Sequence, residues 1–279
     1  MESKVDIVIP AYNERPKAIE STLLACLNQT YPASAIFFVD DYSRQPIVLP
    51  EPFQDRQKPA IQLIRLEVNQ GISVARNTAI RNSSASYIAC VNIDVLLEPD
   101  WIQTCIKCLE ANPSLGACFT KILPHNDASI LSKWRIRFHE QKYDSISGLA
   151  RFAPGHAVLF RRDAIVLVGG YTNELRRTHE DADICFRMRE KGLETYYTID
   201  SFCISIQEDS LSNLAYKQLI RDGFDIDKPF SLHQLVWKTT RSLFNRLARN
   251  LIKGRFYFIP VDLLIYLFGI LSSVKSKSH

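Results

Sequence analysis

Over roughly its first 120 residues the chain alternates short runs of β-branched and aromatic residues with segments of helical periodicity. The runs predict four strands, Val5–Pro10, Ile36–Asp41, Ile61–Leu66 and Tyr87–Asn92. Two of the segments between them predict helices with one apolar face, Lys17–Asn28 and Ser73–Asn82. Such alternation is typical of an α/β fold with a mostly parallel sheet flanked by helices.

The pattern continues less regularly toward the C-terminus. It predicts a helix from Asp100 through Leu109, a strand at His156–Arg161, a short helix to Val168, a helix at Asp181–Lys191, and strands at Thr195–Ile199 and Phe202–Gln207. Between Pro124 and Gly148 we expect a loop or lid with a helix at Ile130–Gln141. After Leu211 the chain is typical of helix throughout. We therefore expect one α/β domain over residues 1–210 and a helical C-terminal region over residues 211–279.

Charge and cysteine content exclude several classes of protein. The chain has 34 Lys and Arg against 30 Asp and Glu, a net charge of +4, and this mild excess does not predict nucleic-acid binding. Cys105 and Cys108 form the only close cysteine pair, and without a second pair or neighbouring histidines they do not predict a zinc site. Residues 1–6 hold no apolar signal segment, so we expect a cytoplasmic protein.

Polar residues collect where the predicted strands end. Tyr12, Asn13 and Glu14 follow the first strand, Asp40 and Asp41 close the second, and Asn92 and Asp94 come at the end of the fourth. Any one group is compatible with ordinary turn chemistry, but ligands of open α/β sheets bind at this edge.

A nucleotide at this edge would need a counter-charge for its phosphates. The sequence has neither G-x-x-x-x-G-K-[ST] nor G-x-G-x-x-G after a strand. A divalent metal on a carboxylate can supply that charge instead, and Mg²⁺ and Mn²⁺ favour one or two carboxylates together with phosphate oxygens and water. Asp94 is the predicted ligand, and Asn92 could reach the metal or the ribose.

Six motifs in order resemble glycosyltransferase family 2, and together they cover about three quarters of the chain. They are Val8–Glu14, Val39–Ser43, Asn69–Asn77, Asn92–Asp94, Leu159–Arg162 with Val168–Tyr171, and His179–Ile184. The resemblance implies a GT-A fold and transfer of a sugar from a nucleoside-diphosphate sugar to an acceptor hydroxyl, with inversion at the anomeric carbon. It divides the domain into a nucleotide-sugar-binding half, about residues 1–121, and an acceptor half, about residues 122–210.

The resemblance also implies a role for each matching position. Asp181 would be the general base, which chemistry requires because a sugar hydroxyl is a poor nucleophile. Asp94 would bind Mn²⁺ or Mg²⁺, which would neutralise the departing diphosphate. The donor would lie against Pro10, Ala11, Tyr12, Glu14, Asp41, Arg76, Asn92 and Ile93, with Asp41 on the base edge. The acceptor side would include Trp101, Gly155, His156 and Glu180.

Two positions depart from the family pattern and leave alternatives open. Asn92 replaces the first acid of D-x-D, and Gln207 stands where family members often carry a histidine. A catalytically weak nucleotide-sugar-binding or scaffold protein of the same fold is therefore the alternative. A nucleotidyltransferase is a weaker one, because the expected glycine-rich, lysine-bearing phosphate loop is missing.

The C-terminal region combines basic and apolar residues. An acid-free stretch carries Lys238, Arg241, Arg246, Arg249, Lys253 and Arg255, interleaved with apolar residues at helical spacing. This is typical of a helix lying on an anionic membrane surface. The following 19 residues, 256–274, hold one charge, Asp262, and could dock on a membrane, pack against the catalytic domain or span the bilayer.

We expect the first of these, with the protein peripheral on the cytoplasmic face and a glycan or lipid-linked acceptor. A chain cut before Leu232 is then expected to be more soluble and to keep donor hydrolysis.

Overall fold

The computed structural model describes residues 3–54, 56–140, 146–175, 178–224 and 230–275. The chain divides into two compact units, each described here by itself. The first comprises residues 1–125 and 140–206, and the second comprises residues 126–139 and 207–279. The end of the helix predicted to reach Gln141 lies outside the described residues.

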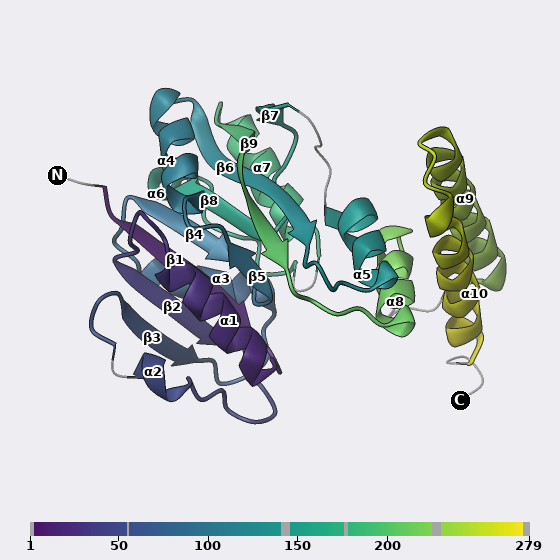
Figure 1. The fold of residues 1–279 in the computed structure, drawn as a ribbon, viewed down its shortest axis with the longest axis horizontal. Helices are drawn as coiled ribbons and strands as arrows, with labels where there is room; N and C mark the ends of the chain where they lie inside the picture. The colour runs from purple at the N-terminus through teal and green to yellow at the C-terminus, as the bar shows by residue number, and fades with distance from the viewer. Residues whose placement is uncertain (1–2, 55, 141–145, 176–177, 225–229, 276–279) are drawn as a thin grey trace. The chain divides into compact units, whose positions relative to one another are not determined.

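The first unit is built on one mixed sheet, which has nine strands within the described ranges (Figure 1). They are β1 Val5–Ala11, β2 Ala35–Asp40, β3 Ala60–Arg65, β4 Tyr87–Val91, β5 Val95–Leu97, β6 Leu115–Pro124, β7 Gly148–Ala150, β8 Ala157–Arg161 and β9 Glu194–Ser205. The order is β3-β2-β1-β4-β8-β6-β9-β5, and β7 pairs with β9. Strands β1 to β4 are parallel, β8 runs antiparallel to β4 and β6, and β6 and β9 are parallel.

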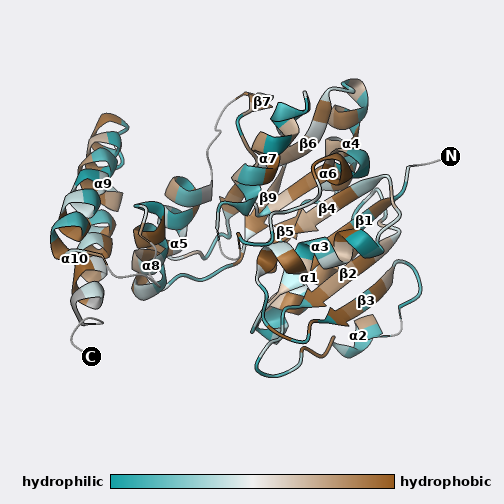
Figure 2. Ribbon diagram, turned by 180° about the vertical axis from the view of Figure 1, so that it is seen from behind, coloured by the Kyte–Doolittle hydropathy of each residue, from teal (hydrophilic) through white to brown (hydrophobic). Residues whose placement is uncertain are grey.

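Helices cover both faces of this sheet. They are α1 Pro16–Leu27, α2 Glu51–Gln54, α3 Ile72–Asn82, α4 Trp101–Ala111, α6 Arg162–Leu167 and α7 Glu180–Glu190. One face shares a core with α3, α6 and α7, in which Ala79, Ile165 and Met188 pack against Val8 and Phe119 of the strands. The helices α1 and α4 lie on the opposite face (Figure 1). Figure 2 shows the strands largely in the hydrophobic colour, as burial between two helical layers requires.

The predicted α/β class is confirmed, but the sequence prediction does not include α2, β5, β6 or β7, and it divides β9 into two strands. The segment Leu115–Pro124 forms the long strand β6, although it contains Gly116 and Pro124 and few β-branched residues. The two strands predicted around Thr195–Gln207 form one strand, β9, whose pairing with β6 shifts register between Thr120 and Lys121. On β9 the pairing passes from Thr198 to Phe202, and an irregularity of this kind lets one strand bend where the sequence pattern suggests a break.

The second unit is helical. It contains α5 Ile130–Arg135, η1 Ile136–Glu140 (whose last residue counts with the first unit), α8 Leu211–Arg221, α9 Leu232–Ile252, η2 Phe256–Phe258 and α10 Ile259–Lys275. Trp134 packs with residues of α8 and α10, among them Leu214 and Ile265. A capping box formed by Ser231 and Gln234 starts α9. None of the helices described is long and apolar enough to cross a membrane.

A buried polar centre joins three of these helices. Asp262 of α10 is fully buried and accepts hydrogen bonds from Trp134 Nε1 (3.0 Å), Arg246 Nε (2.8 Å) and Asn250 Nδ2 (2.6 Å). Burial raises the pKa of Asp262 despite the opposing effect of Arg246. The one charge of the apolar segment is therefore an internal contact that fastens α10 to α5 and α9.

Candidate active site

The loops that follow β1, β2 and β4 contain unusual backbone. Asn13, Tyr42 and Asp94 have φ of 56°, 61° and 70°, and His179, just before α7, has φ of 69°. Positive φ is uncommon outside glycine and tends to concentrate at functional sites, where the surrounding structure offsets its cost. The side chains also tie two loops together, because the Asn13 amide donates to Ser43 Oγ (2.8 Å) and the Arg44 amide donates to Asn13 Oδ1 (2.8 Å). The chain is thus held in a special conformation at the predicted edge.

The loop after β1 presents two of the predicted donor residues to the outside. Tyr12 is exposed, and Glu14 is half-buried with a pKa that burial raises. Pro10 and Ala11 are the last residues of β1 and are buried. A ligand at this edge would therefore meet the side chains of Tyr12 and Glu14 and little more than the backbone of the two residues before them.

Asp41 supports the neighbouring loop. It is almost fully buried, and its carboxylate accepts hydrogen bonds from Asn69 Nδ2 (2.9 Å) and from the amides of Gln70 (2.7 Å) and Gly71 (2.8 Å). Gly71 has φ of 92°, a conformation that suits glycine. The Asp41 carboxylate therefore holds the turn that leads into α3, and its predicted contact with the base of the donor stays a prediction.

Arg76 of α3 lies at the centre of a buried cluster. Its guanidinium donates to Asn92 Oδ1 (2.8 Å) and Gly155 O (2.9 Å), and it pairs with Glu180 Oε1 at 3.1 Å. The Arg76 side chain is 1% exposed, and its predicted place near the donor stays a prediction. The cluster brings together the end of β4, the turn before β8 and the start of α7.

Asp94 is the best-placed candidate for a metal ligand. It is half-buried, its amide donates to Thr22 Oγ1 (3.1 Å), and its carbonyl accepts from the Ile206 amide (2.9 Å). The side chain of Ile93 is buried, which leaves its backbone for any donor contact. The described part of the chain holds no group of three or more His, Cys, Asp or Glu that could bind a metal. A single carboxylate does fit Mn²⁺ or Mg²⁺ when phosphate oxygens and water complete the coordination.

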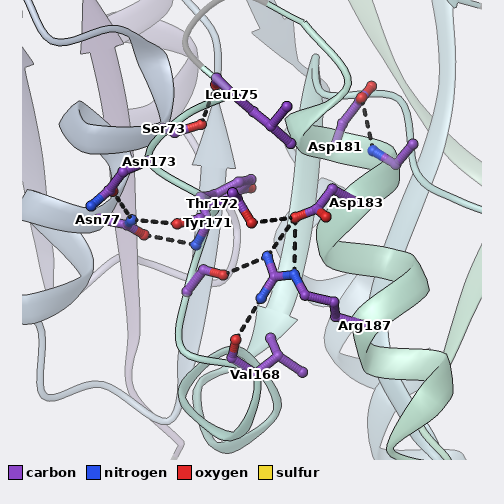
Figure 3. Close-up of polar contacts among 12 residues, drawn as sticks. Ser73, Asn77, Val168, Tyr171, Thr172, Asn173, Leu175, Asp181, Asp183 and Arg187 are labelled. Atoms are coloured by element: carbon purple, nitrogen blue, oxygen red, sulfur yellow. Dashed lines mark hydrogen bonds and ion pairs between the residues drawn. The ribbon is translucent and has the colours of Figure 1, made fainter.

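Asp181 lies in the first turn of α7, where the helix dipole favours a carboxylate. It is half-buried; its Oδ2 accepts from the Gly155 amide (3.0 Å) and its Oδ1 from the Ala182 amide (2.8 Å). Figure 3 shows it apart from Asp183, which is bound to Thr172 Oγ1 (2.7 Å) and Arg187 (2.8 Å). The geometry orients Asp181 and leaves Asp183 a structural role.

Glu180, next to Asp181 in the chain, is buried where Asp181 is half-buried. It is 7% exposed, and burial raises its pKa although Arg76 pulls it down. It is therefore an internal partner of the guanidinium, and its predicted place on the acceptor side stays a prediction.

Two other predicted acceptor residues are inside the fold. Trp101 is fully buried and donates through Nε1 to Thr120 Oγ1 (2.9 Å). His156 is also buried, with Nε2 3.3 Å from the carbonyl oxygen of Thr120. Both side chains pack against β6, and their predicted place on the acceptor side stays a prediction. Gly155 is half-buried and keeps its place beside Asp181.

Sequence reasoning missed the residues of α3 that hold the segment before α7. Ser73 Oγ donates to Leu175 O (2.6 Å), and Asn77 bonds both the amide (2.8 Å) and the carbonyl (2.7 Å) of Tyr171 (Figure 3). Together with Arg76 they lie at i, i+3 and i+4 on one buried face of the helix. That spacing of polar residues within a helical pattern is the signal that could have found them.

Comparison with known sequences shows the protein family to which the chain belongs. Residues 6–167 match the model of Glycosyl transferase family 2, and residues 87–276 match Glycosyl transferase family group 2. The first match covers more than half of the chain, and the chain belongs to Glycosyl transferase family 2.

Two relatives and one solved structure show what the chain is similar to. An N-acetylglucosaminyltransferase of Rhizobium sp. (strain N33) is 25% identical over 93% of this chain and 57% of that protein. A poly-beta-1,6-N-acetyl-D-glucosamine synthase of Staphylococcus epidermidis is 24% identical over 78% of this chain and 53% of that protein. The chain thus spans little more than half the length of these relatives.

The solved structure is a mannosyltransferase from Pyrobaculum calidifontis in complex with GDP-Man and Mn²⁺. It aligns with a TM-score of 0.62 and 18% identity, over 99% of this chain and 87% of that one. At this identity the likeness shows the fold, which is GT-A.

Proposed function

We propose that this protein transfers a sugar from a nucleoside-diphosphate sugar to an acceptor hydroxyl, with inversion at the anomeric carbon. The observation that carries the proposal is the Arg76 cluster. One buried guanidinium contacts both Asn92, two residues before the candidate metal ligand Asp94, and Glu180, next to the candidate base Asp181. A donor-binding carboxylate and a base-providing carboxylate are thereby held in one framework.

The donor side uses the strand ends. Tyr12 and Glu14, with the backbone of Pro10 and Ala11, contact the nucleoside, while Asp41 keeps the adjoining loop in place. Asp94 would hold Mn²⁺ or Mg²⁺, which would supply positive charge to neutralise the departing diphosphate. The proposal is supported by the family and by the Mn²⁺ and GDP-Man named for the similar mannosyltransferase.

Asp181 takes the proton from the acceptor hydroxyl. The amides of Gly155 and Ala182 each bond one of its oxygens, which fixes the plane of the carboxylate. A carboxylate fixed in this way can accept a proton as the new glycosidic bond forms on the opposite side of the sugar from the departing diphosphate. A single displacement of this kind inverts the anomeric centre without a covalent enzyme intermediate.

The acceptor is a polysaccharide or lipid-linked glycan. The names of the two relatives support a donor that carries N-acetylglucosamine and an acceptor that is itself a glycan. UDP-N-acetylglucosamine is therefore the first donor to test, followed by other nucleotide sugars.

A second candidate function is nucleotide-sugar binding with little or no turnover. It is favoured by Asn92 at the first acidic position of the motif, and by the single carboxylate that the described residues offer to a metal at the end of β4. Donor hydrolysis in the presence of Mn²⁺ separates the two, because a binding protein would hold the donor without consuming it.

The C-terminal unit is proposed to attach the protein to the cytoplasmic face of a membrane. On α9, three exposed apolar residues spaced seven apart, Trp237, Phe244 and Leu251, share one side of the helix, and we name them the α9 stripe. Exposed Arg241 and Arg249 lie on the same helix, and no acid stands between residues 238 and 255. Apolar side chains beside cations suit an anionic lipid surface, which would keep the enzyme near a lipid-linked acceptor.

The test of the catalytic assignment compares two carboxylates. Asp181→Asn should bind UDP with Mn²⁺ nearly as well as wild type in calorimetry, but turn over about 10²-fold more slowly or worse, as expected for loss of a general base. Asp94→Ala should weaken UDP binding and turnover together, and its residual binding should no longer respond to EDTA. Asp163→Asn, an exposed acid at the start of α6, is the matched control.

Near-wild-type turnover in Asp181→Asn would remove that residue from the mechanism. Wild-type UDP binding that is equal in Mn²⁺ and in EDTA would remove the metal.

A further inference from the structure

Arg76 is a fully buried cation that the proposed chemistry does not use. Its side chain is 1% exposed, and it contacts hydrogen-bond acceptors on three chain segments, Asn92, Gly155 and Glu180. Burying a charge is costly unless hydrogen bonds and an opposite charge compensate it. The planar guanidinium, with five donors in a fixed fork, suits three acceptors that must be held in set directions. Such a residue is expected to fix geometry.

Gly155 leads from this guanidinium to the base. Its carbonyl oxygen accepts from Arg76 Nη2 at 2.9 Å, and its amide donates to Asp181 Oδ2 at 3.0 Å. A Cβ added at Gly155 would lie 3.4 Å from both Arg76 Nη2 and the Asp181 Cβ, so the glycine is packed between them. A displacement of the guanidinium would therefore move the hydrogen bond that orients Asp181.

Glu180 gives a second, independent link. It pairs with Arg76 and is bonded through the backbone to Asp181, at the first turn of α7. The same face of α3 also holds the preceding segment, where Ser73 contacts Leu175 and Asn77 contacts Tyr171 (Figure 3). Gly170 is fitted to this contact, since a Cβ there would lie 2.6 Å from Asn77 Oδ1. The helix α3 is thus the support on which the chain leading to the base rests.

We infer that Arg76 is a positioning residue, which sets the orientation of Asp181 through Gly155 and Glu180 and ties it to the Asp94 loop through Asn92. The inference rests on the proposed role of Asp181. It differs from a donor-binding role, in which removing Arg76 would weaken nucleotide affinity. It also differs from a purely structural role, in which removing Arg76 would lower stability alone.

The variants Arg76→Met and Arg76→Lys test this, with Arg81→Met as the control. Arg81 lies on the same helix, is exposed and donates to Thr78 Oγ1 (3.1 Å). In Arg76→Met, the affinity for UDP with Mn²⁺ should stay within about threefold of wild type, while kcat falls by about tenfold or more because the base is misplaced. The acidic limb of the kcat–pH profile should move to higher pH, because Arg76 lowers the pKa of Glu180, next to Asp181, and that positive charge has been removed.

Arg76→Lys separates charge from geometry. Lysine keeps the positive charge, so the pH profile should return toward that of wild type, but one ammonium cannot reproduce the three directed contacts, and kcat should stay low. A loss of UDP affinity with unchanged kcat would show instead that Arg76 serves the donor. A lower melting temperature with an unmoved kcat and pH profile in both variants would show a structural role only.

Hydrogen–deuterium exchange gives a readout that does not need turnover. The amides of Gly155 and Ala182 both donate to the Asp181 carboxylate. Hydrogen exchange at these two amides should therefore rise in both Arg76 variants and stay at the wild-type level in Arg81→Met. Unchanged exchange at these amides would overturn the inference. If wild-type protein turned over no donor, the proposed function would fail, while this exchange result would still decide whether Arg76 holds the Asp181 segment.

Discussion

Asn92 takes the place of an acid in the family motif, and its contact with Arg76 offers a physical reason for the neutral side chain. Its Oδ1 accepts a hydrogen bond from the guanidinium, whose ionic partner is Glu180. An aspartate at position 92 would put a second carboxylate on the same buried cation and add negative charge two residues from Asp94. The neutral amide keeps the hydrogen bond and leaves one carboxylate paired with one guanidinium.

Asn92→Asp should therefore change the response to metal. We expect half-maximal donor hydrolysis at roughly three- to tenfold lower Mn²⁺, because a second carboxylate raises the charge of the site. We do not expect faster turnover, since Arg76 would be shared between two acids. Asn82→Asp, at the exposed end of α3, is the control. A Mn²⁺ dependence identical to that of wild type would show that residue 92 does not act on the metal.

Sequence could predict which residue types gather at the strand ends, because chain order and a parallel sheet bring Glu14, Asp41 and Asp94 to one edge. It could not predict which of them face solvent. Trp101 and Arg76 are removed from the surface by contacts with Thr120 and Glu180, which lie 19 and 104 residues away along the chain. Burial of this kind depends on tertiary packing that local pattern does not contain.

Among the elements, the helix α9 shows one side to the fold and another to the outside. Leu235, Thr239 and Leu243 are buried against the rest of the second unit, while the α9 stripe is exposed. Trp237 and Phe244 are 64% and 65% exposed, and exposed apolar patches often mark interaction sites. The amphipathic periodicity of the sequence predicted this helix. The proposed membrane attachment rests on its exposed side.

Replacing Trp237, Phe244 and Leu251 together by Ser should abolish co-flotation with vesicles of phosphatidylcholine and phosphatidylglycerol. The apolar part of binding is proportional to the area buried and is not weakened by salt. Replacing Arg241, Arg249 and Lys253 by Gln should instead remove most of the salt dependence, at about 1 kcal/mol for each cation near an anionic surface.

The matched control replaces Leu24, Val48 and Val166, three exposed apolar residues of the first unit, by Ser. Wild-type protein that stays with the soluble fraction, away from the vesicles, would contradict membrane attachment.

The strand β6 is an element that the local sequence pattern did not predict. Its segment has Gly116, Cys118 and Pro124 in place of a β-branched run, yet Ala117 and Phe119 are buried within the sheet. The strand forms because β8 and β9 pair with it on its two sides. Backbone pairing to partners far along the chain outweighs weak local propensity in this case.

At the scale of the whole chain, the second unit is built from two separate segments. Residues 126–139 leave the first unit between β6 and β7, and join residues 207–279. Trp134 from the earlier segment packs against Leu214 of α8 and Phe258 of η2. The C-terminal helices are therefore part of the core around Trp134.

Deleting residues 232–279 should lower the soluble yield sharply, contrary to the expectation from sequence that such a chain would be more soluble. The deletion removes η2 and α10, which uncovers Trp134 and Leu214 and leaves an apolar surface prone to association. Yield in the supernatant and size-exclusion chromatography measure the effect, with a chain ending at Lys275 as the control. A monodisperse, well-expressed 1–231 protein would show that the second unit does not depend on these helices.

The contact between Trp134 and Asp262 also has a consequence in time. The two residues are 128 positions apart, so the tryptophan leaves the ribosome long before its carboxylate partner is made. At about 5–20 residues per second, that interval is roughly 6 to 25 s. During this interval α5 cannot complete its packing, because α8, η2 and α10, which pack against Trp134, are still being made. Synthesis of this protein therefore includes a period of seconds in which Trp134 of α5 lacks its native partners and is accessible to chaperones.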